Sequence, residues 1–180
     1  KGIRFELYRT LTSGVTMNTY QYQTDSPLGL LRLFADNTHL LAILWENDAP
    51  NRVVLPKSET VQEHDVLQET ASQLQAYFAG TRTAFDVPTR LSGTDFQQQV
   101  WHALQTIPYG QTRTYKDIAI ALGRPTASRA VGAAIGKNPL SIVIPCHRVL
   151  GVTGRLTGFA GGLDSKRFLL DLEQAPTSSV

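Results

Sequence analysis

The sequence predicts an α/β protein of the α+β type with two lobes. One lobe is built on a small antiparallel sheet and a helix, and the other is mainly helical and contains a helix-turn-helix. Between residues 18 and 46, short runs of strand-forming residues alternate with the turn sequences DSPLG and ADNTH, which is typical of an antiparallel meander. Between residues 94 and 136, three successive stretches have helical character. A chain of 180 residues is long enough for two small lobes that share an interface.

The N-terminal lobe is expected to span residues 17–90, and residues 18–46 predict two or three antiparallel strands. A helix is predicted from about Thr60 to Ala79, because apolar residues recur there at helical spacing and Gly80 would end it. These apolar residues are Val66, Leu67, Leu74, Tyr77 and Phe78. The sequence TRTAFDVPTRLSG that follows is interpreted as a linker, with the lobe boundary near Pro88–Gly93.

The C-terminal lobe is expected to span residues 91–175 and to begin with a capped helix. Thr94 and Gln97 have the spacing of a capping box, in which the two side chains satisfy free backbone N–H groups reciprocally. The apolar face of this helix carries Phe96, Val100, Trp101 and Leu104. Thr114 would then cap a short helix, YKDIAIALG, which Gly123 would close.

A second short helix, ASRAVGAAIG, is predicted after the turn GRPT, with Thr126 as its cap and Gly136 at its end. Two short helices joined in this way have the layout of a helix-turn-helix. A strand-like apolar run over residues 141–144, a glycine-rich loop and a last helix over residues 164–173 complete the lobe.

The two ends of the chain lie outside the predicted lobes. Residues 1–16 precede Met17, the only methionine, and are interpreted as an upstream segment, with a genuine N-terminal strand as the alternative. Residues 176–180 are expected to form a short tail.

Composition restricts the classes of function. With 42% hydrophobic and 18% charged residues, the chain has the composition of an ordinary soluble globular protein. A single cysteine cannot form an internal disulfide, which favours a reducing compartment: the cytoplasm of a bacterium or the nucleus of a eukaryote. No apolar stretch approaches the roughly 20 residues of a membrane span, so no membrane partner is expected.

Charge is distributed unevenly along the chain. Residues 111–180 carry nine Lys or Arg against four Asp or Glu, which gives +5, whereas residues 1–110 carry eight against eleven, which gives −3. A basic C-terminal half favours a polyanionic partner.

The second short helix has an unusual composition, since Ala127, Ala130 and Gly132 surround the single arginine Arg129. Small side chains let a helix backbone approach another surface closely, either a neighbouring helix or a nucleic acid groove. A lone arginine among small residues suits insertion into a minor groove better than base-by-base readout. This pattern predicts DNA binding with little sequence preference.

The only cysteine, Cys146, stands between a proline and His147. A thiol becomes a nucleophile as its thiolate, so it needs a group that accepts its proton. His147 is a candidate base, although successive side chains in an extended segment point apart, and a bridging water is one solution. The acidic group that orients the histidine is left open among Asp117, Asp164, Asp171 and Glu173.

Each of these residues also has a purely structural interpretation. Cys146 would be a small buried hydrophobic residue, His147 a core histidine and Arg148 a surface charge. The scattered histidines give no metal-ligand spacing, and the glycine-rich loops match no phosphate or dinucleotide fingerprint, so no metal and no cofactor are predicted.

The sequence IPCHRV at Ile144–Val149 resembles the active-site motif of the O6-alkylguanine-DNA alkyltransferases, also called methylated-DNA–protein-cysteine methyltransferases. The segments FQQQVWHALQTIPYGQTRTYKDIA, RAVGAAIGKNP, GFAGG and K…LL…E follow the family's order and spacing. The resemblance covers about residues 93–173, and residues 19–90 fit the family's N-terminal lobe. It implies a ribonuclease H-like N-terminal lobe.

The resemblance assigns roles to four catalytic residues. Cys146 would accept the alkyl group, and His147 would act as the base through a water. Glu173 would orient His147, and Asn138 would occupy the hinge between the recognition helix and the active-site segment.

The resemblance also implies residues that hold DNA and the substrate base. Arg129 would replace the flipped nucleotide in the stack, and Tyr115 would press on its phosphate. Lys166, Phe159 and Ala160 would line the pocket for the base. Phe159 departs from the family, which often has tyrosine there, and with Cys146 alone the chain cannot build the structural zinc site of some members.

The function predicted in this way is DNA repair by a monomer. The protein would bind duplex DNA through the minor groove, flip out O6-alkylguanine, chiefly O6-methylguanine, and transfer the alkyl group irreversibly to Cys146 in a single turnover. Three alternatives remain: an alkyltransferase-like protein that binds lesions without repair, a DNA-binding regulator, and a Cys-His hydrolase that turns over repeatedly.

Overall fold

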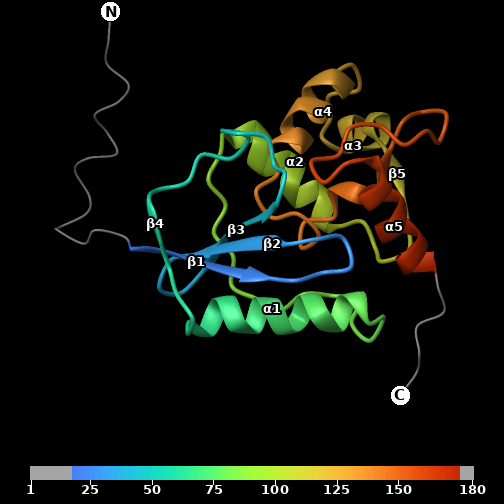
Figure 1. The fold of residues 1–180 in the computed structure, drawn as a ribbon. Coiled ribbons are helices and arrows are strands. Elements are labelled where there is room, and N and C mark those ends of the chain that lie inside the picture. The colour runs from blue at the N-terminus through green and yellow to red at the C-terminus, as the bar shows by residue number, and fades with distance from the viewer. Residues whose placement is uncertain (1–17, 175–180) are drawn as a thin grey trace, which may run out of the picture.

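The computed structural model describes residues 18–174, which form an N-terminal sheet-and-helix lobe and a helical C-terminal lobe (Figure 1). This confirms the predicted α+β fold class. The interpretations of residues 1–16 with Met17, and of the tail 176–180, lie outside the described residues.

A four-stranded sheet forms the centre of the N-terminal lobe, with the strand order β3-β2-β1-β4. Three strands make the predicted antiparallel meander: β1 (Thr19–Thr24), β2 (Leu31–Ala35) and β3 (Leu40–Trp45). The fourth, β4 (Ser58–Thr60), was not predicted and pairs in parallel with β1.

Helix α1 (Asp65–Phe78) packs against the sheet and buries Leu67, Leu74 and Tyr77 (Figure 1). The predicted start at Thr60 is wrong. Residues 58–60 pair with β1 instead, and the backbone of His64, immediately before the helix, is extended. The predicted end is confirmed, because Gly80 follows the helix with a φ of 73°, a conformation that favours glycine.

The C-terminal lobe contains four helices, α2 (Asp95–Gln105), α3 (Tyr115–Ala121), α4 (Ser128–Gly136) and α5 (Leu163–Gln174). Thr94 caps α2 in the predicted capping box with Gln97, and Thr114 caps α3. The predicted cap at Thr126 is wrong: Ala127 precedes α4 and supplies no side-chain cap.

The segment before Cys146 is a turn, so the prediction of a strand over residues 141–144 is wrong. Ile142 has a φ of 74°, far from the extended backbone of a regular strand, and the backbone N–H of Ile144 donates to the carbonyl of Leu140 at 2.8 Å. The turn leads into a single 3-10 turn, η1 (Cys146–Arg148), and then into β6 (Val149–Leu150), which pairs with β5 (Arg113–Thr114).

The two lobes share one hydrophobic core, which includes Leu33 and Tyr77 from the first and Trp101 and Leu140 from the second. The linker runs along the edge of β3: Leu40 donates to the carbonyl of Pro88, and Arg90 donates to the carbonyl of Leu40. The lobes therefore meet over a packed interface that can position groups from one lobe in the site of the other. Within residues 18–174, no helix has the length and apolar character that crossing a membrane requires.

Candidate active site around Cys146

Cys146 lies in a pocket of about 210 Å³ between the helical lobe and the N-terminal lobe. Five other residues predicted for the site line the same pocket: Tyr115, Gly132, Asn138, Phe159 and Ala160. The remaining lining residues are Arg52, Ile135, Gly136, Ser141 and Gly158. The structure thus brings together residues from four segments that lie far apart in the sequence.

Asn138 holds the turn that presents Cys146. Its side-chain Nδ2 donates to the carbonyl of Ile144 at 3.0 Å, and its Oδ1 accepts from the N–H of Leu140 at 3.0 Å. An amide is suited to this position because it offers a donor and an acceptor at once. A hydrogen bond from the Asn138 side chain also favours the thiolate of Cys146.

His147, which follows Cys146 in the chain, is completely buried and forms a 2.7 Å hydrogen bond from Nε2 to Oε1 of Glu173. Burial tends to raise the pKa of Glu173, but hydrogen bonds from His147 and Arg148 lower it to about 2. The ionised carboxylate can only accept, so Nε2 carries the proton of a neutral His147 and Nδ1 carries the lone pair. Nδ1 is buried and makes no hydrogen bond to any residue that the structure describes.

His147 is therefore a neutral imidazole. Burial lowers its pKa, and the nearby charges of Arg148 and Lys166 lower it further, against the opposing effect of Glu173. Glu173 is thus the acidic partner among the four candidates that the sequence left open.

Arg148 is not a surface charge, since it is only 7% exposed. Its Nε and Nη2 donate to the two oxygens of Glu173 at 2.8 and 2.9 Å, and its Nη1 donates to the carbonyl of Ile107 at 2.6 Å. A charge buried in this way is compensated by the carboxylate, which fixes both groups in one geometry.

Burial raises the pKa of the Cys146 thiol, which by itself would leave it protonated and unreactive. Four influences oppose this effect: the Asn138 side chain, the positive charges of Lys166 and Arg52, and a hydrogen bond from the backbone of Cys146 itself. Reactivity at Cys146 consequently depends on these neighbours rather than on exposure.

Lys166 is fully buried on α5, and burial lowers its pKa to about 8. Its ammonium group donates to the carbonyl of Val149 at 2.6 Å and to that of Thr157 at 2.8 Å. Lys166 therefore stands behind the pocket and holds the loop that carries Phe159 and Ala160.

Phe159 and Ala160 face the N-terminal lobe. The ring of Phe159 meets Trp45 edge-on at 5.6 Å, and Trp45 Nε1 donates to Ser141 Oγ at 3.1 Å. A side chain at Gly161 would place its Cβ 2.6 Å from the indole of Trp45, which explains why this loop needs glycine.

Three predicted DNA-binding residues do not line the pocket. Arg129 and Ala130 are exposed near the start of α4, and Ala127 immediately precedes this helix. Their roles on DNA stay predictions.

Sequence reasoning missed Arg52, Tyr77 and Trp45, which all belong to the N-terminal lobe. Arg52 pairs with Asp48 and donates from Nη1 to the carbonyl of Asn138 at 2.6 Å. Local sequence patterns could not identify these residues, because their contacts in the site lie more than 80 residues away along the chain.

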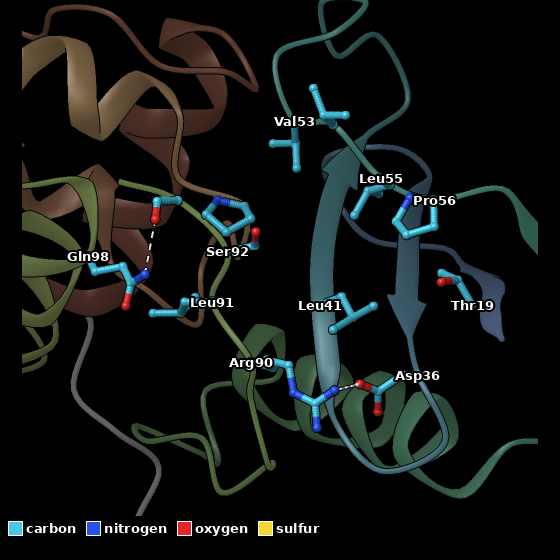
Figure 2. Close-up of a pocket in the computed structure, with 13 residues that line it drawn as sticks. Thr19, Asp36, Leu41, Val53, Leu55, Pro56, Arg90, Leu91, Ser92 and Gln98 are labelled. Atoms are coloured by element: carbon cyan, nitrogen blue, oxygen red, sulfur yellow. Dashed lines mark hydrogen bonds and ion pairs between the residues drawn. The ribbon is translucent and has the colours of Figure 1, made fainter. Parts of the chain in front are cut away.

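A second pocket, of about 640 Å³, lies between the sheet and the linker (Figure 2). Figure 2 shows its largely apolar walls, with Leu41, Val53 and Leu55 on one side and Leu91 on the other. None of the residues predicted for the site lines it. Within residues 18–174, no group of three His, Cys, Asp or Glu side chains could hold a metal ion.

Comparison with known proteins was made for the whole chain. Residues 17–91 match the family model of the 6-O-methylguanine DNA methyltransferase ribonuclease-like domain, and residues 95–175 match that of the DNA-binding domain. The methylated-DNA–protein-cysteine methyltransferase of Methanosarcina barkeri is 48% identical over 83% of this chain and 94% of its own. That of Mycobacterium tuberculosis is 48% identical over 86% of this chain and 92% of its own.

Solved structures give the same result. The crystal structure of Mycobacterium tuberculosis OGT in complex with DNA matches with a TM-score of 0.78 at 44% identity, over 86% of this chain and 92% of that one. The O6-methylguanine-DNA methyltransferase of the archaeon Pyrococcus kodakaraensis shares the fold at 23% identity, with a TM-score of 0.65. Both lobes are thus those of the 6-O-methylguanine DNA methyltransferase family, to which this chain belongs.

Proposed function

We propose that the protein repairs DNA by transferring the alkyl group of O6-alkylguanine, chiefly O6-methylguanine, to Cys146. One observation carries the proposal: the only thiol of the chain lines a pocket, and the next residue in the chain is a buried, neutral histidine that a buried carboxylate orients. This arrangement can generate a nucleophile inside a closed site. The family to which the chain belongs supports the choice of substrate.

The first step is removal of the thiol proton. His147 accepts it at Nδ1 through one water, because Nε2 is committed to Glu173. The resulting thiolate is favoured by Asn138, Lys166 and Arg52.

The second step is an in-line displacement at the alkyl carbon. The bond from sulfur to carbon forms as the bond from carbon to O6 breaks, and the electron pair of that bond leaves with guanine. Backbone N–H groups around Ala160 and the charge of Lys166 would stabilise the developing anion. The thioether has no route back to a thiol, so each molecule acts once.

The base must leave the duplex to reach a thiol that is only 6% exposed. Flipping costs a few kcal/mol and costs least for a damaged, poorly paired base. Arg129 on the exposed face of α4 would fill the gap in the stack, and the small residues Ala127 and Ala130 would let the helix approach the minor groove. Binding of this kind is largely independent of sequence.

The alternative of a lesion-binding protein without repair activity is disfavoured by Cys146 itself. Such a protein has no need of an acceptor thiol with a base behind it.

The decisive experiment is incubation of the protein with a duplex containing one O6-methylguanine, followed by peptide mapping by mass. We expect stoichiometric gain of one methyl group on the Cys146 peptide and none in Cys146→Ser. Binding of the duplex without methyl gain would favour the lesion-binding alternative. Methyl gain in Cys146→Ser would overturn the assignment of the acceptor.

A further inference from the structure

Tyr77 connects the N-terminal lobe directly to the carboxylate behind the reacting thiol. It lies on α1 and is completely buried among the rings of Phe78, Phe85 and Tyr109. Its hydroxyl donates to Oε1 of Glu173 at 2.7 Å, across 96 residues of sequence. A buried hydroxyl needs a hydrogen-bond partner, and the partner of the Tyr77 hydroxyl is Glu173, the residue that orients His147.

The two oxygens of Glu173 are shared among donors from different elements. Oε1 accepts from Tyr77, from His147 Nε2 and from Arg148 Nη2, and Oε2 accepts from Arg148 Nε and from the N–H of Gly110 at 3.2 Å. Arg148 is the charged donor and holds both oxygens. Without the hydrogen bond from Tyr77, we expect the Glu173 carboxylate to shift toward Arg148 and Gly110 and away from His147.

We propose that Tyr77 is a positioning residue of the transfer reaction: its hydroxyl holds Oε1 of Glu173 toward His147, so that Nε2 keeps the proton and Nδ1 stays free as the base. This inference deepens the proposed function and rests on it for its kinetic consequence. It also gives the N-terminal lobe a part in the chemistry, since Tyr77 on α1 supports the triad of Cys146, His147 and Glu173, which all lie in the C-terminal lobe.

The charges around the triad fix the direction of the expected effect. Burial lowers the pKa of His147 most, and the charges of Arg148 and Lys166 lower it further, whereas the hydrogen bond to Glu173 raises it. Tyr109 also lies near Glu173, but its hydroxyl donates to the carbonyl of Leu172 at 3.3 Å. Burial and the charge of Glu173 raise the pKa of Tyr77, so it stays a neutral donor at every working pH.

The test compares Tyr77→Phe with Tyr109→Phe in the full-length protein. Both substitutions remove one phenolic hydroxyl from the same aromatic cluster and keep the ring, but only the first removes a donor to Glu173. Three quantities are measured: the free energy of unfolding, the rate of benzyl transfer from free O6-benzylguanine to Cys146 as a function of pH, and the ring ¹⁵N shifts of His147. The shifts report the tautomer and the pKa of His147 without requiring any transfer.

In Tyr77→Phe we expect benzyl transfer to slow by roughly 3- to 10-fold, the scale of the net contribution of one ordinary hydrogen bond. The Nε2–H tautomer of His147 should lose population and its pKa should fall, because the bond that raises this pKa is weakened. Tyr109→Phe should change neither the rate nor the shifts, whatever its effect on unfolding.

Equal rates and equal His147 shifts in the two variants would overturn the proposal and leave Tyr77 a structural residue. A rise in the pKa of His147 would also overturn it, because it would show that Tyr77 merely competes with His147 for Oε1. If the unmodified protein transfers neither a benzyl group from the free base nor a methyl group from the duplex, the proposed function fails, and the His147 shifts still decide the part played by Tyr77.

Discussion

The surroundings of Cys146 determine how readily its thiol ionises. The thiol is buried, and burial alone raises its pKa and makes it a packing residue. What distinguishes it is the set of groups that favour the thiolate, together with a neutral imidazole whose second nitrogen is committed to a carboxylate. The motif predicted Cys146 and His147, whereas spacing alone left four acidic candidates for the partner of His147.

Glu173 compensates the buried positive charge of Arg148. We expect Glu173→Gln to lower the free energy of unfolding by about 3 kcal/mol at neutral pH, because the buried Arg148 loses its counterion. The native pKa of about 2 lies below the ordinary 4.5, so the charge of Glu173 stabilises the fold above about pH 4.5 and stops doing so as the pH falls toward 2. The difference between the two proteins should therefore shrink over that range.

Urea unfolding at several pH values measures this difference. Asp171→Asn, on the exposed face of the same helix, is the matched control and should behave like the unmodified protein. A difference between Glu173→Gln and the unmodified protein that does not change with pH would contradict the assignment of the stabilisation to the ionised carboxylate.

At the scale of elements, the sequence predicted helices better than turns. The capping box at Thr94 and the helix cap at Thr114 are local patterns of a few residues, and both were confirmed. The turn at residues 139–145 looked like a strand because its residues are apolar, but the side chain of Asn138 closes it with two hydrogen bonds. Strand β4 was missed because its pairing partner β1 lies about 40 residues away in the sequence.

Helix α4 carries Gly132 in its interior, where it lines the pocket of Cys146. A Cβ there would lie 3.7 Å from the ring of Tyr115, an ordinary contact, so we expect Gly132→Ala to fold and to raise the free energy of unfolding by roughly 0.5–1 kcal/mol. Methyl transfer from duplex DNA should nevertheless slow, because the added methyl group occupies the wall of the pocket.

Chemical denaturation measures the expected gain in stability, and single-turnover kinetics with the same preparations measure the expected loss of methyl-transfer rate. Ala133→Gly, on the exposed side of α4, should lower stability by about the same amount and leave the rate unchanged. If Gly132→Ala gains stability and keeps its full rate, the glycine is not required by the pocket.

At the scale of the whole molecule, the N-terminal lobe supplies three side chains to the environment of Cys146: Arg52, Tyr77 and Trp45. The lobes themselves were predictable, because each has its own periodicity and turn signals. The contacts between the lobes were not predictable, since they depend on how two surfaces pack and produce no local sequence pattern. Arg52 illustrates this, because it stands in a loop without any periodic pattern.

Arg52 joins the two lobes at Asn138, beside the pocket of Cys146. Its guanidinium is fixed by Asp48, donates to the carbonyl of Asn138 at 2.6 Å, and its charge favours the thiolate of Cys146. We expect Arg52→Gln to lower the free energy of unfolding by about 1.5–3 kcal/mol, the scale of a charge-assisted hydrogen bond. We also expect the pKa of Cys146 to rise, which slows its alkylation at neutral pH and moves the reaction to higher pH.

Iodoacetamide labelling of Cys146 across a pH series, with unfolding measured in parallel, separates the two effects. Arg90→Gln is the matched control, because Arg90 pairs with Asp36 in the N-terminal lobe and does not line the pocket of Cys146. This variant should lose some stability and keep the pH dependence of labelling. Arg52→Lys retains the charge and should keep more of the thiolate than Arg52→Gln, since a lysine preserves the field but not the fork of hydrogen bonds. Identical pH dependence in all four proteins would show that the N-terminal lobe stabilises the site without tuning its thiol.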